Sequence, residues 1–554
     1  MRKNTKEYFN ELSKRDLSEE YKCVNALQAT PWRANEKLIK VLKQAWHSGE
    51  EWAGLPPRED LPLPPYPFDK EPADLSDLEK EQFKDWRKRR NSIYQFNAKS
   101  MSKRIQVDRT IELAEDYIQY AQFWFVWQLD FRGRKYPVES FMSPQVADWG
   151  KATIEFANGV PINSEEEAEW LAIHGANVFG EDKISLSERV RWAYAHNEQV
   201  AKVAESPFEY LWWTEADKPW QFLAWCFEWD QWIKQGVGFI THHPTSADGS
   251  CNGLQHLSSI LLDERAGGAV NLVPSDLPRD IYTDVANEAK RSIEQEAMQG
   301  SEMAKQCLEF GIDRKMTKRS VMIVPYSGTQ HACRAYIEEA IEEKVVKGSA
   351  SPWGDDYFTP SLYLSSHIWA AIGTVITAAR EVMTFVKDIG RAYAKHSIPM
   401  EWVTPTNLLV RQAYPELKLR RIKTLIAGSI VKLAYQQQLE DTISKSKTAS
   451  GSSPNFIHSL DAAALTKTVN SCLDVGITDF AMVHDSYGTH SPNMPKMVDI
   501  LREEFVKMYQ KHDVLQELYD HARNKLGDEV ELPPLPKKGT LNLSGILESD
   551  YFFA

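Results

Sequence analysis

Two aspartates, Asp248 and Asp485, each follow a short apolar run and precede small residues. Residues 480–489 read FAMVHDSYGT. The apolar run leads to Asp485, and Gly488 predicts a turn, which is typical of a short buried strand. A carboxylate there is costly to bury unless a cation, hydrogen bonds or solvent compensates it. A solvated turn aspartate is the simpler interpretation of this stretch alone.

The stretch before Asp248 has a similar chemistry. An apolar run with Phe239 and Ile240 leads to Asp248, and Gly249 and Gly253 leave room for something large to approach the backbone. If the two carboxylates met in space, they could hold two divalent ions about 3.5–4 Å apart, which stabilise the attacking and leaving oxygens in nucleotidyl transfer. Mg²⁺ suits such a site because it takes few carboxylates and keeps water and phosphate oxygens as its other ligands.

Residues 311–328, GIDRKMTKRSVMIVPYSG, hold cations at helical spacing. Asp313 can cap a helix, and Arg314 and Lys318 stand at i and i+4 on one face. Two cations so placed could clamp a polyphosphate, and Lys318 could protonate a leaving pyrophosphate. Tyr326, about two turns further on, could close the pocket. An ordinary surface helix with basic residues is the alternative.

The composition is ordinary for a soluble globular protein. Of 554 residues, 26% are charged and 42% hydrophobic, and the length suffices for about three or four domains. No apolar run approaches the roughly 18 residues of a membrane span. The N-terminal MRKNTKEYFNELSKRD lacks the apolar core of a signal peptide, and its acids argue against a transit peptide. The six cysteines are scattered without a C-x-x-C, which indicates a reducing cytoplasm and no structural zinc.

The net charge of −13 argues only weakly against a nucleic-acid partner, because the clustering of cations matters more than the total. Residues 84–104 hold eight basic side chains against one acid, with aromatic side chains between them. Residues 411–423 hold five more against Glu416. Such clusters suit phosphate contacts, although each could equally be a solvated face.

The elements that must position these residues alternate between long helical stretches and short β-prone runs. The pattern predicts helices over 17–50, 76–127, 278–347 and 361–396, and further helices around the 480–489 strand. The seven prolines of 54–72 predict a stiff, extended connection. The pattern also predicts a β-type segment at 129–138 around Gly133, a strand, turn and helix over 236–260, and a hairpin and loop over 424–453.

Four stretches, taken together and in order, add what spacing alone does not: DGSCNGLQH at 248–256, RKMTKRSVMIVPY at 314–326, PNFIHSLD at 454–461 and VHDSYGT at 483–489. They resemble the palm, fingers and palm motifs of the bacteriophage-type single-subunit DNA-directed RNA polymerases, the phage and mitochondrial family. LDFRGRKYP, HGANVFG and the terminal LNLSGILESDYFFA are also similar to family segments, so the resemblance runs from about Leu17 to the last residue.

The resemblance implies an α+β, mostly helical right-hand polymerase with a small antiparallel palm sheet. Its parts are expected to be an N-terminal helical remnant at 1–35, a thumb at 36–121, a palm at 122–275 and 458–554, and fingers at 276–457 with a promoter-reading hairpin at 424–453. The C-terminal Phe553-Ala554 would form a foot close to the active site. Family members usually have a substantial N-terminal domain, so we expect its functions from a separate polypeptide or their loss by truncation.

Carried over residue by residue, the resemblance implies that Asp248 and Asp485 bind two catalytic Mg²⁺ ions, assisted by the Gly249 carbonyl. Arg314 and Lys318 would hold the triphosphate of the incoming nucleotide. Lys318 would also be the general acid that protonates the leaving pyrophosphate.

The resemblance gives roles to further residues that the unaided sequence would leave structural. Tyr326 and His458 would inspect the sugar and favour ribose, and Tyr282 would lie near the substrate. Arg132 and Arg134 would lie near the template or the hybrid backbone. Without the resemblance, His458 would be interpreted as a core histidine and Tyr282 as a helix-face tyrosine.

The implied function is a DNA-directed RNA polymerase, in which the RNA 3′-hydroxyl attacks the α-phosphate of a ribonucleoside triphosphate and pyrophosphate leaves. Its partners would be the DNA template and promoter, nascent RNA and ribonucleoside triphosphates, without a membrane, in the cytoplasm of an infected bacterial host. The family usually has Tyr-Gly at the end of the fingers helix. This chain has Tyr326-Ser327-Gly328 after Pro325, which alters the backbone at the sugar-selecting tyrosine.

Two alternative functions are weighed against this one. A DNA polymerase with the same palm would typically have an aromatic residue in place of Met322, a glutamate in place of Gly253 and an acid in place of Ser486, so the sequence disfavours it. A non-catalytic nucleic-acid-binding subunit would not need both carboxylates and both cations.

Overall fold

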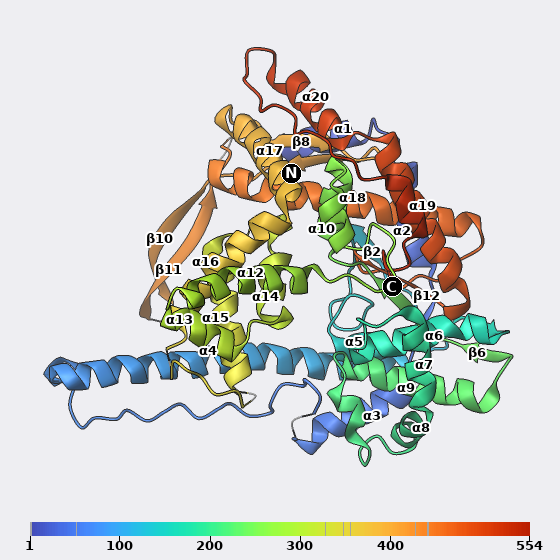
Figure 1. The fold of residues 1–554 in the computed structure, drawn as a ribbon, viewed down its shortest axis with the longest axis horizontal. Helices are drawn as coiled ribbons and strands as arrows, with labels where there is room; N and C mark the ends of the chain where they lie inside the picture. The colour runs from blue at the N-terminus through green and yellow to red at the C-terminus, as the bar shows by residue number, and fades with distance from the viewer. Residues whose placement is uncertain are drawn as a thin grey trace.

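The computed structural model describes residues 3–50, 52–326, 328–346, 348–354, 356–426, 428–439 and 442–554. Helices dominate, and every described strand pairs with one other strand in a small antiparallel sheet. The predicted mostly helical α+β fold with a small antiparallel sheet is therefore confirmed (Figure 1).

The long helix α4 (Asp77–Tyr117) dominates the first part of the chain. It begins at a capping box of Ser76 and Glu79, and the proline-rich segment runs extended beside it, as expected (Figure 1). The predicted helix over 76–127 was too long, because Phe123 exchanges two backbone hydrogen bonds of 2.8 Å with Trp32 instead of continuing the helix. The preceding elements are α1 (Lys3–Leu12), α2 (Ser18–Ala29), β1 (Trp32–Ala34), α3 (Glu36–Ser48) and η1 (Pro72–Asp74).

The residues after α4 form a hairpin and then a tryptophan-rich core. Gly133 has a φ of +94° in the turn between β2 and β3, which confirms the β-type segment predicted there. Trp220, Trp225 and Trp229 of α9 are fully buried in this core. The elements are β2 (Trp127–Leu129), β3 (Lys135–Pro137), α5 (Asp148–Ala152), β4 (Ile154–Phe156), β5 (Val160–Ile162), α6 (Glu165–Phe179), α7 (Leu186–Ala195), α8 (Asn197–Glu205), η2 (Leu211–Glu215), α9 (Pro219–Gln235) and β6 (Phe239–Thr241).

The expected strand, turn and helix over 236–260 form β6, β7 (Thr245–Asp248) and α10 (Asn252–Leu261). Helix α10 is buried along its whole length, so it anchors the end of β7 in the larger of two hydrophobic cores. The short helix α11 (Glu264–Ala269) follows.

The mostly helical stretches expected over 278–347 and 361–396 are confirmed among the described residues, and their helices share that larger core. They are α12 (Ile281–Met298), α13 (Glu302–Phe310), α14 (Arg314–Met322), η3 (Val324–Tyr326), α15 (Gln330–Val346), α16 (Phe358–Val375) and α17 (Thr377–Lys395). In the described part of the chain no single helix is long and apolar enough to cross a membrane, and only α16 with α17, bent by 92° at their junction, meets that criterion as a pair.

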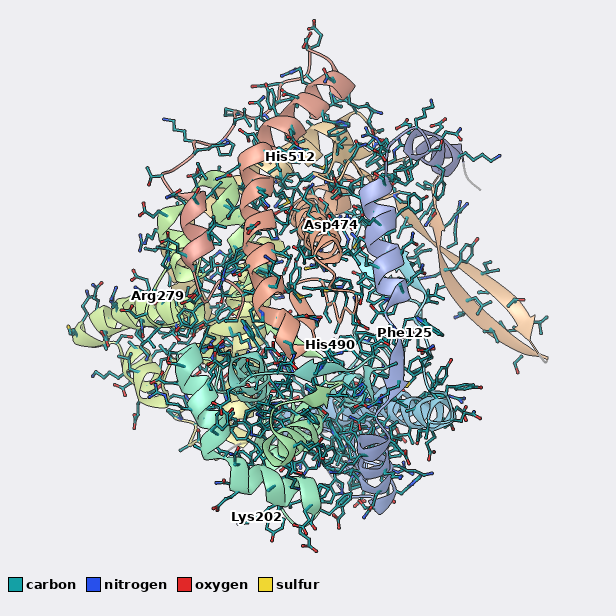
Figure 2. The ribbon with its side chains drawn as sticks, turned by 90° about the vertical axis from the view of Figure 1, so that its right-hand side faces the viewer. Phe125, Lys202, Arg279, Asp474, His490 and His512 are labelled. Carbon is teal, nitrogen blue, oxygen red and sulfur yellow. The ribbon has the colours of Figure 1, made fainter. Side chains whose placement is uncertain are left out.

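A long hairpin of β10 (Leu417–Ile426) and β11 (Ser429–Gln438) projects from the body of the molecule in both views (Figures 1 and 2). The bounds of the hairpin and loop predicted over 424–453 were therefore wrong, because β10 already begins at Leu417. Residues 445–453 begin helix α18 (Lys445–Asp474) rather than a loop. Ala427, Glu440 and Asp441 of the predicted hairpin lie outside the described residues.

Packing explains why the polar stretch before Pro454 is helical. Thr448 and Ser452 are fully buried, and the Ser452 hydroxyl donates back to the Ala449 carbonyl at 3.0 Å. The Thr448 carbonyl accepts from Gln412 Nε2 at 2.9 Å. Residues that favour turns in isolation are thus held in a helix by tertiary contacts. Gln412 lies on β9 (Leu409–Gln412), which pairs with β8 (Met400–Val403).

The C-terminal part of the chain returns to the middle of the fold. After β12 (Ser486–Thr489) come η4 (Ser491–Asn493), α19 (Met494–Lys511), α20 (Val514–Leu526) and η5 (Leu543–Glu548). Strand β12 pairs with β7, and His490, which follows β12, lies near the centre of the molecule (Figure 2). The β7–β12 pairing thereby joins two segments that lie far apart in the sequence.

Candidate active site

The pairing of β7 with β12 brings the two aspartates together. Asp248, the last residue of β7, lies opposite Ser486, and Asp485 directly precedes Ser486. The Gly249 amide donates to the Asp485 carbonyl at 3.1 Å, so the backbone continues to join the segments beyond the strands. The convergence that the sequence left open is therefore observed in the structure.

The local structure around Asp485 differs from the prediction. Residues 480–483 do not form a separate strand that ends at Asp485. The Ala481 amide donates to the Gly488 carbonyl at 2.8 Å and the Val483 amide to the Ser486 carbonyl at 2.9 Å, so His484 and Asp485 form the turn. Gly488 is not a turn residue but lies inside β12, where a Cβ atom would come 2.8 Å from the Ala481 carbonyl oxygen.

The electrostatic environments of the two carboxylates differ. Burial raises the pKa of Asp485, and the neighbouring charge of Asp248 raises it further. For Asp248, burial also acts upward, but Lys218 and the Ser486 side chain outweigh it and lower the pKa. A nearby like charge favours a proton or a cation on one of the two acids.

Lys218 makes a contact that sequence reasoning missed. Its ammonium lies 3.2 Å from Asp248 Oδ2. Lys151 lines the same cavity, and its pKa is lowered by burial and by the charge of Lys218. Nothing in the spacing of these lysines marks them, because they come from segments whose proximity to β7 only the fold creates.

Helix α14 presents Arg314 and Lys318 to the same cavity, which has a volume of about 450 Å³. Asp313 caps the helix by accepting from the Met316 amide at 3.1 Å, as predicted. Arg314 Nε donates to Asp280 Oδ2 at 2.9 Å. Burial, followed by the charge of Arg314, lowers the pKa of Lys318. A cation whose ammonium gives up its proton more readily than usual is suited to general-acid work.

Arg314 and Tyr282 meet at one wall of the cavity. The guanidinium carbon lies 5.3 Å from the centre of the Tyr282 ring. Tyr282 itself lines the cavity together with the cations, and its proximity to a substrate stays a prediction. The salt bridge to Asp280 was not predicted, and it fixes the direction of the guanidinium group.

Tyr326 and His458 form a second group beside the cavity, with ring centres 4.8 Å apart. A Cβ atom on Gly253 would come 3.0 Å from Pro325 and 3.4 Å from the Tyr326 hydroxyl, so a glycine at this position permits the approach. Pro325 and Tyr326 lie in η3. Ser327, the other departure from the usual family sequence, lies outside the described residues.

Arg132 orients His458. Its Nη1 lies 2.7 Å from His458 Nδ1, and because a guanidinium can only donate, this ring nitrogen accepts and the other holds the proton. Burial and the charges of Arg134 and Arg132 lower the pKa of His458 to about 2. His458 is therefore neutral at physiological pH.

Arg132 and Arg134 are both engaged by carboxylates of the protein. Arg132 Nε donates to Asp130 Oδ2 at 2.8 Å. Arg134 makes a two-pronged pair with Asp461, at 3.1 Å and 2.5 Å, in which the side chains are 13% and 2% exposed. Arg134 is thus mostly buried in its pair with Asp461 and does not lie on an open surface. A contact of either arginine with nucleic-acid backbone stays a prediction.

The C-terminal segment packs against the loop after Asp248. A Cβ atom on Gly249 would come 2.9 Å from the Phe553 ring, so a larger residue there would displace the tail. Gln255 Nε2 donates to the Phe552 carbonyl at 2.8 Å. Asn271 also reaches this region: its Nδ2 donates to Ser250 Oγ at 2.8 Å, and its carbonyl accepts from the Ser549 hydroxyl at 2.7 Å.

The donor set fits a divalent ion held by few protein ligands. Two carboxylates at neighbouring positions offer hard oxygen donors of the kind that Mg²⁺ prefers. The ammonium of Lys218 against Asp248 shows that a cation fits there. Among the residues that the structure describes, no cluster of three or more histidine, cysteine or acidic side chains forms an all-protein metal cage.

Comparisons with known proteins find similar sequences over most of the chain. A family model described as DNA-dependent RNA polymerase matches residues 162–530. The chain is 33% identical over 583 residues to the DNA-directed RNA polymerase of Enterobacteria phage T3, covering 97% of this chain and 65% of that protein. It is 32% identical over 584 residues to T7 RNA polymerase of Escherichia phage T7, with the same two coverages of 97% and 65%.

Plant organelle proteins are also similar. DNA-directed RNA polymerase 1B, mitochondrial, of Nicotiana tabacum is 31% identical over 561 residues, covering 100% of this chain and 54% of that protein. The chain thus spans slightly less than two thirds of the phage relatives and about half of the plant relative. Because the relatives come from both phages and organelles, they do not decide the compartment, and they offer no support for the expected separate polypeptide.

Proposed function

The chain belongs to the DNA-dependent RNA polymerase family of the phage type, and on this premise we propose that it is a DNA-directed RNA polymerase. It would transfer ribonucleotides to an RNA 3′-hydroxyl on a DNA template and release pyrophosphate. The observation that supports this activity most is the adjacency of Asp248 and Asp485 in one cavity with Arg314 and Lys318.

The carboxylates of Asp248 and Asp485, with the Gly249 carbonyl, are proposed to hold two Mg²⁺ ions. When bound, these ions would supply charge stabilisation to the attacking and leaving oxygens of the phosphoryl group. The raised pKa of Asp485 and the position of the two acids in one cavity support this assignment, because two neighbouring negative charges favour a shared cation.

The side chains of α14 would bind and discharge the polyphosphate. Arg314, held in direction by Asp280, would hold the triphosphate as a fixed cation. Lys318 would donate a proton to the leaving pyrophosphate, and its lowered pKa supports that role. Tyr282 would form the wall beside the phosphates.

Tyr326 and His458 would select the sugar. Their rings lie together at 4.8 Å, and the neutral His458 holds a proton on the ring nitrogen that does not face Arg132. A site built to hydrogen-bond a hydroxyl discriminates strongly against an analogue that lacks it. Ribose, with its 2′-hydroxyl, would therefore be preferred over deoxyribose.

The parts of a right-hand polymerase are proposed at the boundaries expected from the resemblance, apart from the hairpin. Residues 36–121 would be the thumb, 122–275 and 458–554 the palm, and 276–457 the fingers. The promoter-reading hairpin would be β10 and β11. We propose the cytoplasm of an infected bacterium as the compartment, on the basis of the phage relatives, which are 32–33% identical to this chain.

The test is extension of a short RNA annealed to a DNA template, with Mg²⁺ and the four ribonucleoside triphosphates. The expected product is longer RNA whose sequence follows the template. Parallel reactions with deoxynucleotides distinguish the DNA polymerase alternative, which would prefer them. Tight binding of the hybrid with no extension by either substrate would favour the non-catalytic subunit.

A further inference from the structure

Lys218 occupies an unusual position for a basic residue, because its ammonium lies 3.2 Å from the Asp248 carboxylate proposed to hold a metal ion. Both side chains are about half-exposed, at 43% and 53%, so the pair faces the cavity rather than the core. Lys151 lines the same cavity, and its charge also acts on Asp248 and Asp485.

The backbone fixes Lys218 at this place. Its amide donates to the Val178 carbonyl at 3.0 Å, and its carbonyl accepts from the Phe222 amide at 2.9 Å. The neighbouring Asp217 amide donates to the Phe179 carbonyl at 2.9 Å. Pro219 begins α9 directly afterwards and restricts the conformation of the residue before it. The side chain is therefore presented to Asp248 by the junction of α6 and α9.

An ammonium and a divalent ion at contact distance from the same carboxylate repel each other strongly where solvent is partly excluded. Binding of an ion by Asp248 therefore favours movement of Lys218 away from it. The side chain can do so, since a lysine has a flexible four-carbon stem and open space on the cavity side.

We propose that Lys218 is a placeholder cation: it pairs with Asp248 in the ion-free enzyme, leaves when a divalent ion binds, and thereby sets the affinity of the site for the ion. Lys218 is a positioning residue in this role, and the inference rests on the proposed function. In the ion-free state it offsets the repulsion between Asp248 and Asp485. The cost of displacing it makes ion binding weaker than the carboxylates alone would give.

The experiment measures Mn²⁺ binding to the intact chain, without nucleic acid or nucleotide, from the loss of the free-ion electron paramagnetic resonance signal. Binding by Asp248→Asn gives the background from other acids. Lys218→Met should lower the dissociation constant about tenfold, which corresponds to about 1.4 kcal/mol. Lys218→Arg, which keeps the charge, should stay within about twofold of the unchanged chain.

Lys183→Met is the matched control. Lys183 lines the same cavity but pairs with Asp182 at 2.9 Å, so its loss should change Mn²⁺ affinity by less than about threefold through the general field alone. An equal gain from Lys183→Met and Lys218→Met would overturn the placeholder role. So would unchanged or weaker Mn²⁺ binding by Lys218→Met.

Thermal unfolding gives a second readout. Without ions, Lys218→Met should melt below the unchanged chain because the two carboxylates lose their counter-charge. With saturating Mn²⁺ its upward shift should be the larger of the two, since tighter binding to the folded state stabilises more. Lys218→Gln replaces Lys218→Met if the latter fails to fold, with the same expectation. An equal or smaller shift contradicts the inference, and a chain that binds ions in this way yet fails to extend RNA would refute only the proposed activity.

Discussion

The candidate active-site cavity and the β10–β11 hairpin use opposite structural means to present charged side chains. The cavity is built at a four-residue pairing of β7 with β12, where buried neighbours determine the position of each acid and cation. The hairpin pairs ten residues on each strand, yet Leu425 and Ile430 near its tip are 70% and 74% exposed. The positions of the acids at the short strands depend on their surroundings, whereas the long hairpin is held by its own regular cross-strand pairing.

The charges of the two regions differ in the same way. Arg314, in the cavity, is paired with Asp280, and the buried Arg134 nearby is paired with Asp461. On one face of the hairpin, Arg421 and Lys423 lie two residues apart on β10, and Lys432 of β11 pairs with Lys423. Substitutions in the cavity should therefore have large, all-or-none effects, and those on the hairpin small, additive and salt-dependent ones.

The largest effect is expected from Asp485→Asn. Removing one carboxylate should slow RNA extension by at least about a thousandfold, since a loss of about 4 kcal/mol of charge stabilisation has that consequence. Binding of the RNA–DNA hybrid should stay within about twofold. Asp474→Asn, at the exposed end of α18 (Figure 2), is the matched control and should extend normally. Extension at a normal rate by Asp485→Asn would remove the metal assignment.

The same substitution in both regions sharpens the contrast in stability. Arg134→Met leaves the buried Asp461 unpaired and should lower the free energy of unfolding by about 3 kcal/mol, at the lower end for a broken buried pair. Arg421→Met, on the exposed hairpin, should change it by less than about 0.5 kcal/mol. Denaturant unfolding measures both. Equal changes would show that the Arg134–Asp461 pair is not buried in solution.

A smaller effect is expected from Tyr326→Phe. Loss of one hydroxyl at the proposed sugar-selecting position should reduce discrimination against deoxynucleotides about tenfold, which is typical for one hydrogen bond in a site built for it. Competition between labelled ribo- and deoxynucleotides on one template position measures it. Tyr435→Phe, on the hairpin, is the matched control. Selectivity that does not change would place the sugar gate elsewhere.

On the hairpin, Lys423→Ala should weaken binding of duplex DNA by about threefold at low salt. The slope of log affinity against log salt should become less steep by about 0.9, as expected for one lost phosphate contact. Extension of a preformed primer–template should fall far less, because the hairpin stands away from the cavity. A salt slope that stays the same would mean that this lysine does not contact phosphate.

The smallest effect is expected from pH. Because the pKa of His458 is lowered to about 2, its ring is neutral on both sides of pH 6.5, where an ordinary histidine titrates. Sugar selectivity should therefore change by less than about twofold between pH 6 and pH 8. The His458→Gln variant should show the same flat profile at a lower selectivity. A transition near pH 6.5 in the unchanged chain alone would contradict the buried, arginine-facing histidine.

Local sequence patterns predicted much of the fold and those parts of the site whose residues are close together in the sequence. The Asp313 cap and the i, i+4 pair of Arg314 and Lys318 follow from short-range rules, and the structure has them as expected. The extent of the predicted hairpin and loop was wrong because the turn-prone residues 445–453 are held in helix α18 by buried contacts. Such contacts leave no local pattern in the sequence.

Local sequence patterns did not predict contacts between segments that lie far apart in the chain. The meeting of Asp248 with Asp485 depends on a strand pairing that only the family resemblance implied in advance. Gly488 was misinterpreted because its role is to let the Ala481 carbonyl approach, not to turn the chain. Lys218 had no signal at all, since its backbone is positioned by residues of α6 and its side chain by the presence of Asp248.

The most direct test of the shared ion site is anomalous diffraction from crystals of the chain with Mn²⁺, an RNA–DNA hybrid and a non-hydrolysable ribonucleoside triphosphate. The result we predict is manganese density between the carboxylates of Asp248 and Asp485, with the nucleotide phosphates on the Arg314 and Lys318 side. A nucleotide bound in this cavity with no manganese against either aspartate would contradict the account.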